Sequence, residues 1–126
     1  MENSDKKILV IEDDTFLLDI LIKNLTKAGF LVVCAEDGEK GLAKALEIHP
    51  NLILLDILLP AMNGMDVLKN LRQDPWGKTA HVIILSNISS PANISESIKY
   101  SADDYLVKAD FDLKSLMEKI KKGLEK

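Results

Sequence analysis

The sequence predicts one doubly wound α/β domain, in which a five-stranded parallel sheet is covered on both faces by five helices. Short apolar runs and helical patterns alternate five times along the chain, as βαβ units do. Most of these runs are apolar throughout, which is typical of strands buried on both faces of a parallel sheet. The length of 126 residues, 47% of them hydrophobic and 29% charged, suits a single domain with its own core.

The five predicted strands are the apolar runs themselves. They span residues 8–11, 31–35, 52–55, 82–85 and 105–107. Four of them are predicted to be buried, and the run over 31–35 is a candidate edge strand. Cys34, within that run, is expected to pack in the core.

Helical spacing of apolar residues predicts helices between these strands. The first covers residues 15–28 and ends at Gly29, and the second covers 39–48 and stops before Pro50. The third begins after Asn63-Gly64 and breaks at Pro75. These boundaries leave only short connections, so no linker divides the chain.

The last two helices have recognisable first turns. Ser90 is the expected N-cap of the fourth, with Pro91 in its first turn and Ile94 and Ile98 facing inward. Either Asp110 or Asp112 caps the fifth helix. Its apolar stripe has clean helical spacing and consists of Leu113, Leu116, Met117, Ile120 and Leu124.

Five such units connected by right-handed crossovers most commonly adopt the flavodoxin-like strand order 2-1-3-4-5. We therefore expect residues 1–126 to form one domain, with its core over about residues 6–124.

Composition excludes several classes of protein. A net charge of −4 and a pI near 5.1 argue against direct nucleic-acid binding. A single cysteine excludes an internal disulfide and a cysteine-based zinc site. No apolar run reaches the ~20 residues of a membrane helix, and the polar N-terminus is unlike a signal peptide. A cytoplasmic location without membrane contact is expected.

Polar groups follow four of the predicted strands. They are Glu12-Asp13-Asp14, Asp56, Ser86 and Lys108. In the order 2-1-3-4-5 the first and third strands are neighbours about 4.8 Å apart, which brings Asp13 close to Asp56. Each group alone has an ordinary structural interpretation, as a helix start, a turn former or a surface lysine. All four at the carboxyl edge of one sheet indicate a ligand site, and clustered carboxylates favour a divalent cation such as Mg²⁺.

These segments resemble a known family. The motifs are Ile8-Leu9-Val10-Ile11-Glu12-Asp13-Asp14, Leu54-Leu55-Asp56-Ile57-Leu58-Leu59-Pro60-Ala61-Met62-Asn63-Gly64, Ile84-Leu85-Ser86 and Asp104-Tyr105-Leu106-Val107-Lys108. They are similar to the receiver domain of bacterial response regulators, the CheY-like fold, over about residues 6–124. The resemblance implies a phosphoacceptor signalling domain of a two-component system rather than an enzyme. The only reactions that it implies for the domain are magnesium-dependent self-phosphorylation and slow self-dephosphorylation.

By this resemblance Asp56 is the phosphoacceptor, and Lys108 contacts a phosphoryl oxygen. Asp13 ligates Mg²⁺ directly, Glu12 acts mainly through water, and Asp56 and the backbone carbonyl of Leu58 complete the ligands. Asp14 falls outside the pair and starts a helix.

The resemblance also implies a switch and partners. Ser86 would hydrogen-bond the new phosphoryl group, and Tyr105 would change rotamer with it. The face of the fourth helix, fifth strand and fifth helix would then alter, and is a candidate homodimer surface. A histidine kinase or phosphotransfer protein would be the donor, and the downstream target is unknown. The sequence leaves open whether the chain is a stand-alone regulator or one domain of a longer protein.

Rival functions lack their residues. An aspartyl phosphatase needs an acid where Leu58 stands, and a P-loop or flavodoxin phosphate loop is absent after the first strand. The serious alternative is a receiver-like interaction module that is not phosphorylated.

One departure from the family is Ala109, where proline usually follows the lysine through a cis bond. We expect the Lys108–Ala109 bond to be cis so that Lys108 still points at the phosphoryl group.

Overall fold

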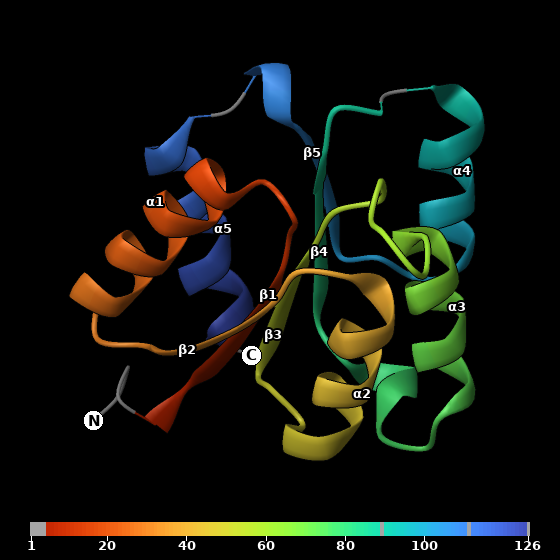
Figure 1. The fold of residues 1–126 in the computed structure, drawn as a ribbon, viewed down its shortest axis with the longest axis horizontal. Helices are drawn as coiled ribbons and strands as arrows, with labels where there is room; N and C mark the ends of the chain where they lie inside the picture. Colours follow the sequence, from red (N-terminus) through yellow and green to blue (C-terminus); the bar gives the residue numbers. More distant parts are fainter. Residues whose placement is uncertain (1–4, 89, 111, 126) are drawn as a thin grey trace.

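A computed structural model describes residues 5–88, 90–110 and 112–125 (Figure 1). The outermost residues of the predicted domain, 1–4 and 126, therefore lie outside the described residues. The elements follow one another as β1 (Lys7–Ile11), α1 (Thr15–Lys27), β2 (Leu31–Ala35), α2 (Gly38–Ile48), β3 (Leu52–Leu55), α3 (Gly64–Gln73), η2 (Gly77–Thr79), β4 (Val82–Ser86), α4 (Pro91–Lys99), β5 (Asp104–Val107), η3 (Lys108–Asp110) and α5 (Leu113–Leu124).

The five strands form one parallel sheet in the order β2-β1-β3-β4-β5, which confirms the predicted topology. The register places Ile11 of β1 opposite both Ala35 of β2 and Leu55 of β3. Ser86, the last residue of β4, lies opposite Val107 of β5. The carboxyl ends of all five strands therefore meet at one edge of the sheet, where α/β sheets of this kind bind ligands.

Two layers of helices cover the sheet (Figure 1). Helices α1 and α5 lie on one face, and α2, α3 and α4 lie on the other. Leu18, Leu21 and Leu25 of α1 pack with Leu116 and Ile120 of α5 on the first face. On the second face the buried side chains of α3 pack against β1, β3 and β4. Since β3 and β4 are covered on both faces, every residue of both strands is buried, and all of them except Ser86 at the end of β4 are apolar.

Side-chain caps determine where the helices begin. Ser90 caps α4 as predicted, and Asp112, the second of the two predicted candidates, caps α5. Asp14 caps α1 by accepting hydrogen bonds from the amides of Phe16 and Leu17, which confirms its predicted role at a helix start. Capping satisfies amides that have no partner within the helix.

Three predictions about burial are wrong. Strand β5 is only half-buried, because it is the second of the two edge strands of the sheet. Ile98 is 69% exposed, and Ser97 takes the inward position on α4 instead. Cys34 is exposed on the edge strand β2. Apolar type alone did not show on which side of an edge element a side chain lies.

In the described part of the chain, no helix is long and apolar enough to span a membrane.

Candidate functional site

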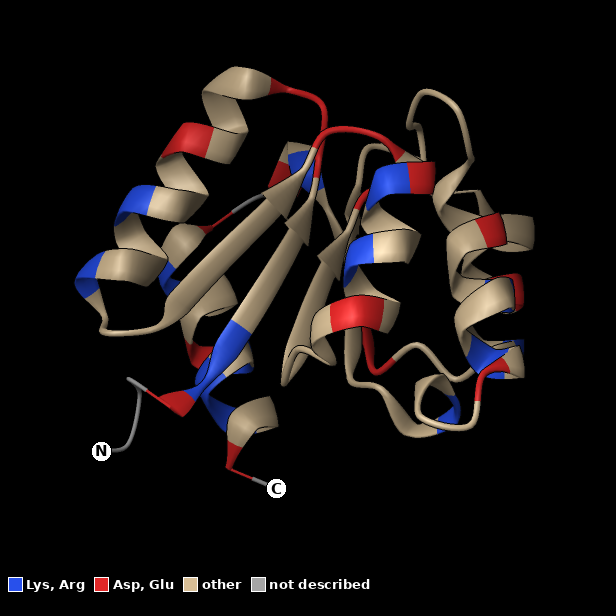
Figure 2. Cartoon of the chain, turned by 60° about the horizontal axis from the view of Figure 1, so that its bottom comes forward, with Lys and Arg blue, Asp and Glu red and all other residues tan. Residues whose placement is uncertain are grey.

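The site lies at the carboxyl edge of the sheet, where the parallel ladder continues past the ends of the strands. The amide of Glu12 donates to the carbonyl of Ala35 at 3.0 Å, and the amide of Asp56 donates to the carbonyl of Ile11 at 3.1 Å. These bonds hold the residues that follow β1 and β3 side by side. Figure 2 shows acidic positions, in red, gathered in the loops at this edge of the sheet.

Three carboxylates come together here, as the sequence predicts. Glu12, Asp13 and Asp56 each offer one oxygen within 4.8 Å of the others. Glu12 and Asp56 are buried, with 2% and 5% of their surface exposed, whereas Asp13 is exposed to solvent. Hard oxygen donors with one exposed member suit a cation such as Mg²⁺, which keeps several waters. The donor set thus fits the metal that the sequence predicts.

Lys108 bridges the two buried carboxylates. Its Nζ lies 2.8 Å from Oε1 of Glu12 and 2.9 Å from Oδ2 of Asp56. Burial disfavours the charged form of Lys108, but the hydrogen bonds and negative charges of both acids outweigh this and raise its pKa. Burial is also the main reason that the pKa of Glu12 is raised, although Lys108 acts in the opposite direction. The direct contact between Lys108 and Glu12 was not predicted from the sequence.

The remaining oxygens of these acids are also held. Oδ1 of Asp56 accepts from the amide of Ile57 at 2.7 Å, and Oε2 of Glu12 accepts from the amide of Asp14 at 3.0 Å. Among the described residues, no buried side-chain nitrogen or oxygen lacks a partner. The Asp56 carboxylate is therefore pre-oriented by its own loop and by Lys108.

The peptide bond between Lys108 and Ala109 is trans, so the predicted cis bond is wrong. Ala109 lacks the proline ring that makes a cis bond affordable, and a cis bond without proline costs about 2.5–4 kcal/mol. Lys108 begins the short helix η3 instead and still reaches both acids. Aiming the lysine consequently does not require the cis geometry.

Ser86 and Tyr105 meet at the backbone of Ile88. The amide of Ile88 donates to Oγ of Ser86 at 3.3 Å, and the hydroxyl of Tyr105 donates to the carbonyl of Ile88. Ser86 is buried and Tyr105 is half-buried. Burial, and secondarily the charge of Asp56, raise the pKa of Tyr105. The contact of the Ile88 backbone with both Ser86 and Tyr105 was not predicted, because backbone contacts of this kind leave no mark on the sequence.

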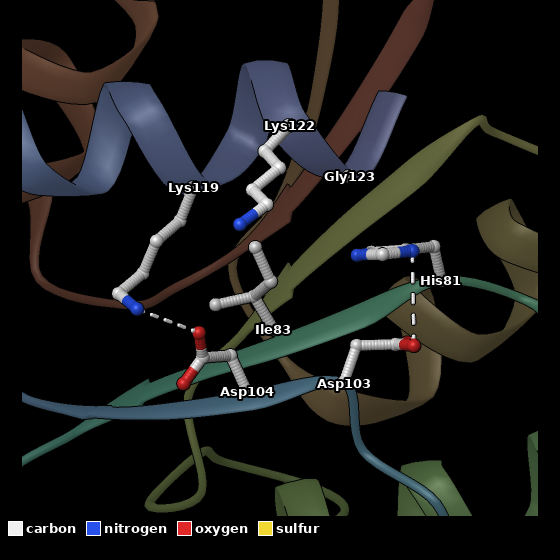
Figure 3. Close-up of a pocket in the computed structure, with 7 residues that line it drawn as sticks. All are labelled: His81, Ile83, Asp103, Asp104, Lys119, Lys122 and Gly123. Carbon is white, nitrogen blue, oxygen red and sulfur yellow. Dashed lines mark ion pairs between the residues drawn. The ribbon is translucent and has the colours of Figure 1, made fainter. Parts of the chain in front are cut away.

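A separate pocket lies at the opposite edge of the sheet, beside the start of β4 and β5 (Figure 3). It has a volume of about 230 Å³. Asp104 pairs with Lys119 at 3.0 Å, and Nδ1 of His81 lies 3.7 Å from Asp103. This pocket carries both signs of charge and shares no residue with the acidic cluster.

The chain is similar to known proteins over most of its length. Residues 8–121 match the family model described as the response regulator receiver domain. The chain is 35% identical over 115 residues to the DNA-binding dual master transcriptional regulator RpaA of Synechocystis, covering 91% of this chain and 47% of that protein. It is 35% identical to the response regulator ArlR of Staphylococcus aureus, covering 91% and 51%. It thus spans about half the length of these relatives.

A solved structure shows the same fold. The CheY-like response regulator receiver domain protein from Methanospirillum hungatei has a TM-score of 0.89 and 33% sequence identity to this chain. The match covers 95% of this chain and 94% of that one.

Proposed function

This chain belongs to the response regulator receiver domains of two-component systems, and from this membership we propose that Asp56 is its phosphoacceptor. The observation that carries the proposal is the position of Lys108, whose ammonium group bridges Asp56 and Glu12 beside Asp13. A buried aspartate with a cation on one oxygen and a metal-binding cluster beside it has the parts that phosphoryl transfer needs.

In the proposed reaction an oxygen of the Asp56 carboxylate attacks the phosphorus of a phosphodonor. The new O–P bond forms as the bond from phosphorus to the donor breaks, and the donor leaves with that electron pair. The Ile57 amide on Oδ1 orients the carboxylate, and Lys108 neutralises charge on the equatorial oxygens. The phosphoryl group is thus transferred to a side chain of the domain itself. In the slow self-dephosphorylation that ends the signal, water attacks the phosphorus and the Asp56 carboxylate leaves with the electron pair of the broken O–P bond.

We propose that Asp13 and Asp56 ligate Mg²⁺ directly, with Glu12 acting mainly through water and the carbonyl of Leu58 completing the protein ligands. The ion, when bound, supplies positive charge for the phosphoryl oxygens. Support comes from the clustered carboxylate oxygens. Leu58 lies two residues after Asp56, and because its hydrocarbon side chain has no ligand atom, its backbone carbonyl is the group that could bind the metal.

The proposed switch runs through Ile88. Phosphorylated Asp56 presents new acceptor oxygens, and Ser86 would turn toward them as a donor. Its hydrogen bond with the Ile88 amide would then break, and the Ile88 carbonyl that holds Tyr105 would move with the loop. A local change of charge would thereby alter the face made by α4, β5 and α5.

The partners of the domain are proposed by family membership. A histidine kinase or a phosphotransfer protein would supply the phosphoryl group. The α4, β5 and α5 face would contact the downstream target or a second copy of the chain. RpaA, one relative, is named as DNA-binding; this chain has an acidic composition, and we assign no nucleic-acid contact to the domain itself.

Mass spectrometry tests the phosphoacceptor. The chain is incubated with phosphoramidate or acetyl phosphate and magnesium, alongside Asp56→Asn and Asp66→Asn. Asp66, an exposed acid in the first turn of α3, is the matched control. We expect one phosphoryl adduct on the parent and on Asp66→Asn, and none on Asp56→Asn. An unmodified parent, or an equal adduct on Asp56→Asn, would favour the alternative of an interaction module that takes no phosphate.

A further inference from the structure

Two glycines, Gly38 and Gly64, make close contacts with the backbone of the loop between β3 and α3. At its far end the amide of Gly64 donates to the carbonyl of Ile57 at 2.7 Å, and a Cβ on Gly64 would lie 1.9 Å from the carbonyl oxygen of Asp56. From the side, the amide of Gly38 donates to the carbonyl of Pro60 at 3.0 Å. A Cβ on Gly38 would lie 1.8 Å from the carbonyl oxygen of Met62.

Both contacts are backbone to backbone. A Cβ atom essentially never lies closer than 3.0 Å to a heavy atom outside its own residue and its chain neighbours. Replacing either glycine would therefore require the loop backbone to move. Gly64 belongs to the helix that the loop enters, and its contact is local. Gly38 is different, because it is the buried first residue of α2 and comes from a separate part of the chain.

The segment touched by Gly38 is itself tightly defined. The carbonyl of Pro60 accepts from the amide of Met62 at 2.7 Å as well as from Gly38. Ala61, between them, has a φ of 68° in the left-handed region, which costs a residue with a Cβ about 1–2 kcal/mol. Surrounding contacts must therefore hold this turn, and the Gly38 contact is one of them.

We propose that Gly38 is a positioning residue for the metal site. By holding Pro60 and Met62, the start of α2 sets the path of the loop and hence the place of the Leu58 carbonyl. This inference rests on the proposed function, in which that carbonyl is a ligand for Mg²⁺. Partners that orient a metal ligand typically change affinity by about 10–100-fold when they are lost.

Calorimetric titration with magnesium chloride tests the proposal. We expect Gly38→Ala to bind magnesium about tenfold more weakly than the parent. Gly77→Ala is the matched control: Gly77 begins η2 at the opposite edge of the sheet, and a Cβ there would lie 2.0 Å from the carbonyl oxygen of Leu71 in α3. The control should lose stability and keep its magnesium affinity. Parental affinity in folded Gly38→Ala, or an equal loss in Gly77→Ala, would overturn the proposal.

Hydrogen exchange on the unsubstituted chain decides the matter if Gly38→Ala does not fold. Coupling between two sites is reciprocal, so magnesium should slow exchange of the Gly38 amide severalfold. The amide of Asn51, bonded to the Lys7 carbonyl at 2.8 Å at the far edge, is the reference and should not change. A parent that binds magnesium without slowing Gly38 would overturn the positioning role alone. A parent that binds no magnesium would overturn the metal site and this inference together.

Discussion

Lys108 donates to Oδ2 of Asp56 at 2.9 Å across a separation of 52 residues in the chain. Both side chains are largely withdrawn from water, with 15% and 5% of their surface exposed. The same ammonium group pairs with Glu12. One cation therefore offsets two buried carboxylates when no metal is bound.

Replacing Lys108 with Met should lower the free energy of unfolding by about 3–5 kcal/mol in EDTA, because two buried carboxylates lose their cation. Added magnesium should recover part of the loss by restoring positive charge. Urea unfolding with and without magnesium measures both effects. Lys119→Met is the control, since its pair with Asp104 is exposed and worth only about 0–1 kcal/mol. A Lys108→Met loss as small as the control would show that the buried pair contributes little.

Asp13→Asn should lose most magnesium binding while the domain stays folded. Asp13 is the exposed member of the carboxylate cluster, and removing its charge also relieves repulsion within that cluster. Asp14→Asn removes a neighbouring charge but retains a side chain that caps helices well. Calorimetric titration should therefore separate the two variants. Equal affinity in Asp13→Asn and the parent would place the metal elsewhere.

Ala61→Gly should raise the free energy of unfolding by up to about 1 kcal/mol. The substitution relieves the left-handed strain at a φ of 68°, and the greater freedom of glycine in the unfolded chain offsets part of the gain. Gly29→Ala tests the same rule in reverse, because Gly29 has a φ of 100° and should resist a Cβ. Thermal unfolding of both variants checks the signs. A less stable Ala61→Gly would mean that unfolded-chain entropy outweighs the strain.

The phenol of Tyr105 should titrate above its ordinary value of 10.0, because burial raises its pKa and the charge of Asp56 adds to the shift. A raised pKa means that Tyr105 contributes stability below about pH 10, which is lost as the pH rises through the folded-state pKa. Asp56→Asn should lower the pKa of Tyr105 relative to the parent. That pKa should still lie above 10.0, since the effect of burial remains. Ultraviolet titration follows both tyrosines, and Tyr105→Phe identifies the step. An unmoved step in Asp56→Asn would show that the two groups are not coupled.

The phosphorylated state should be long-lived, because we expect Leu58 and Ile88, which lie two residues after Asp56 and two after Ser86, to flank the path of an attacking water. Both side chains are apolar, so neither can orient that water. Leu58 is exposed and Ile88 is half-buried. Each water-orienting contact worth ~1.4 kcal/mol in the transition state would speed hydrolysis about tenfold. Decay after removal of the donor should accelerate in the double variant Leu58→Asn with Ile88→Glu. Leu46→Asn, on α2, is the control. Decay of the parent within seconds would contradict the prediction.

The order of strands and helices could be predicted from local sequence. Apolar runs, cap residues and helix-ending glycines act within a few residues of one another, so the chain shows them directly. Parallel topology then placed Glu12, Asp13 and Asp56 at one edge, because the carboxyl ends of parallel strands meet there. The resemblance to receiver domains, and not topology alone, singled out these three acids and left out Asp14, and they are the three that cluster in the fold.

Contacts made by backbone groups could not be predicted in this way. Nothing in the residue types shows that Ile88 joins Ser86 to Tyr105 or that Gly38 touches the loop after Asp56. Peptide groups are the same in every residue, so such pairings depend only on where the fold brings two segments together.

Local patterns were enough to predict the elements, their order and the polar groups at the strand ends, since propensity, capping and apolar periodicity act over a few residues. That Lys108 bridges both buried acids from a trans peptide bond emerged from the folded chain alone. It also decided that Ile98 and Cys34 face solvent. The physical reason is that exposure at an edge and the reach of a long side chain depend on the packing of elements that are far apart in the chain.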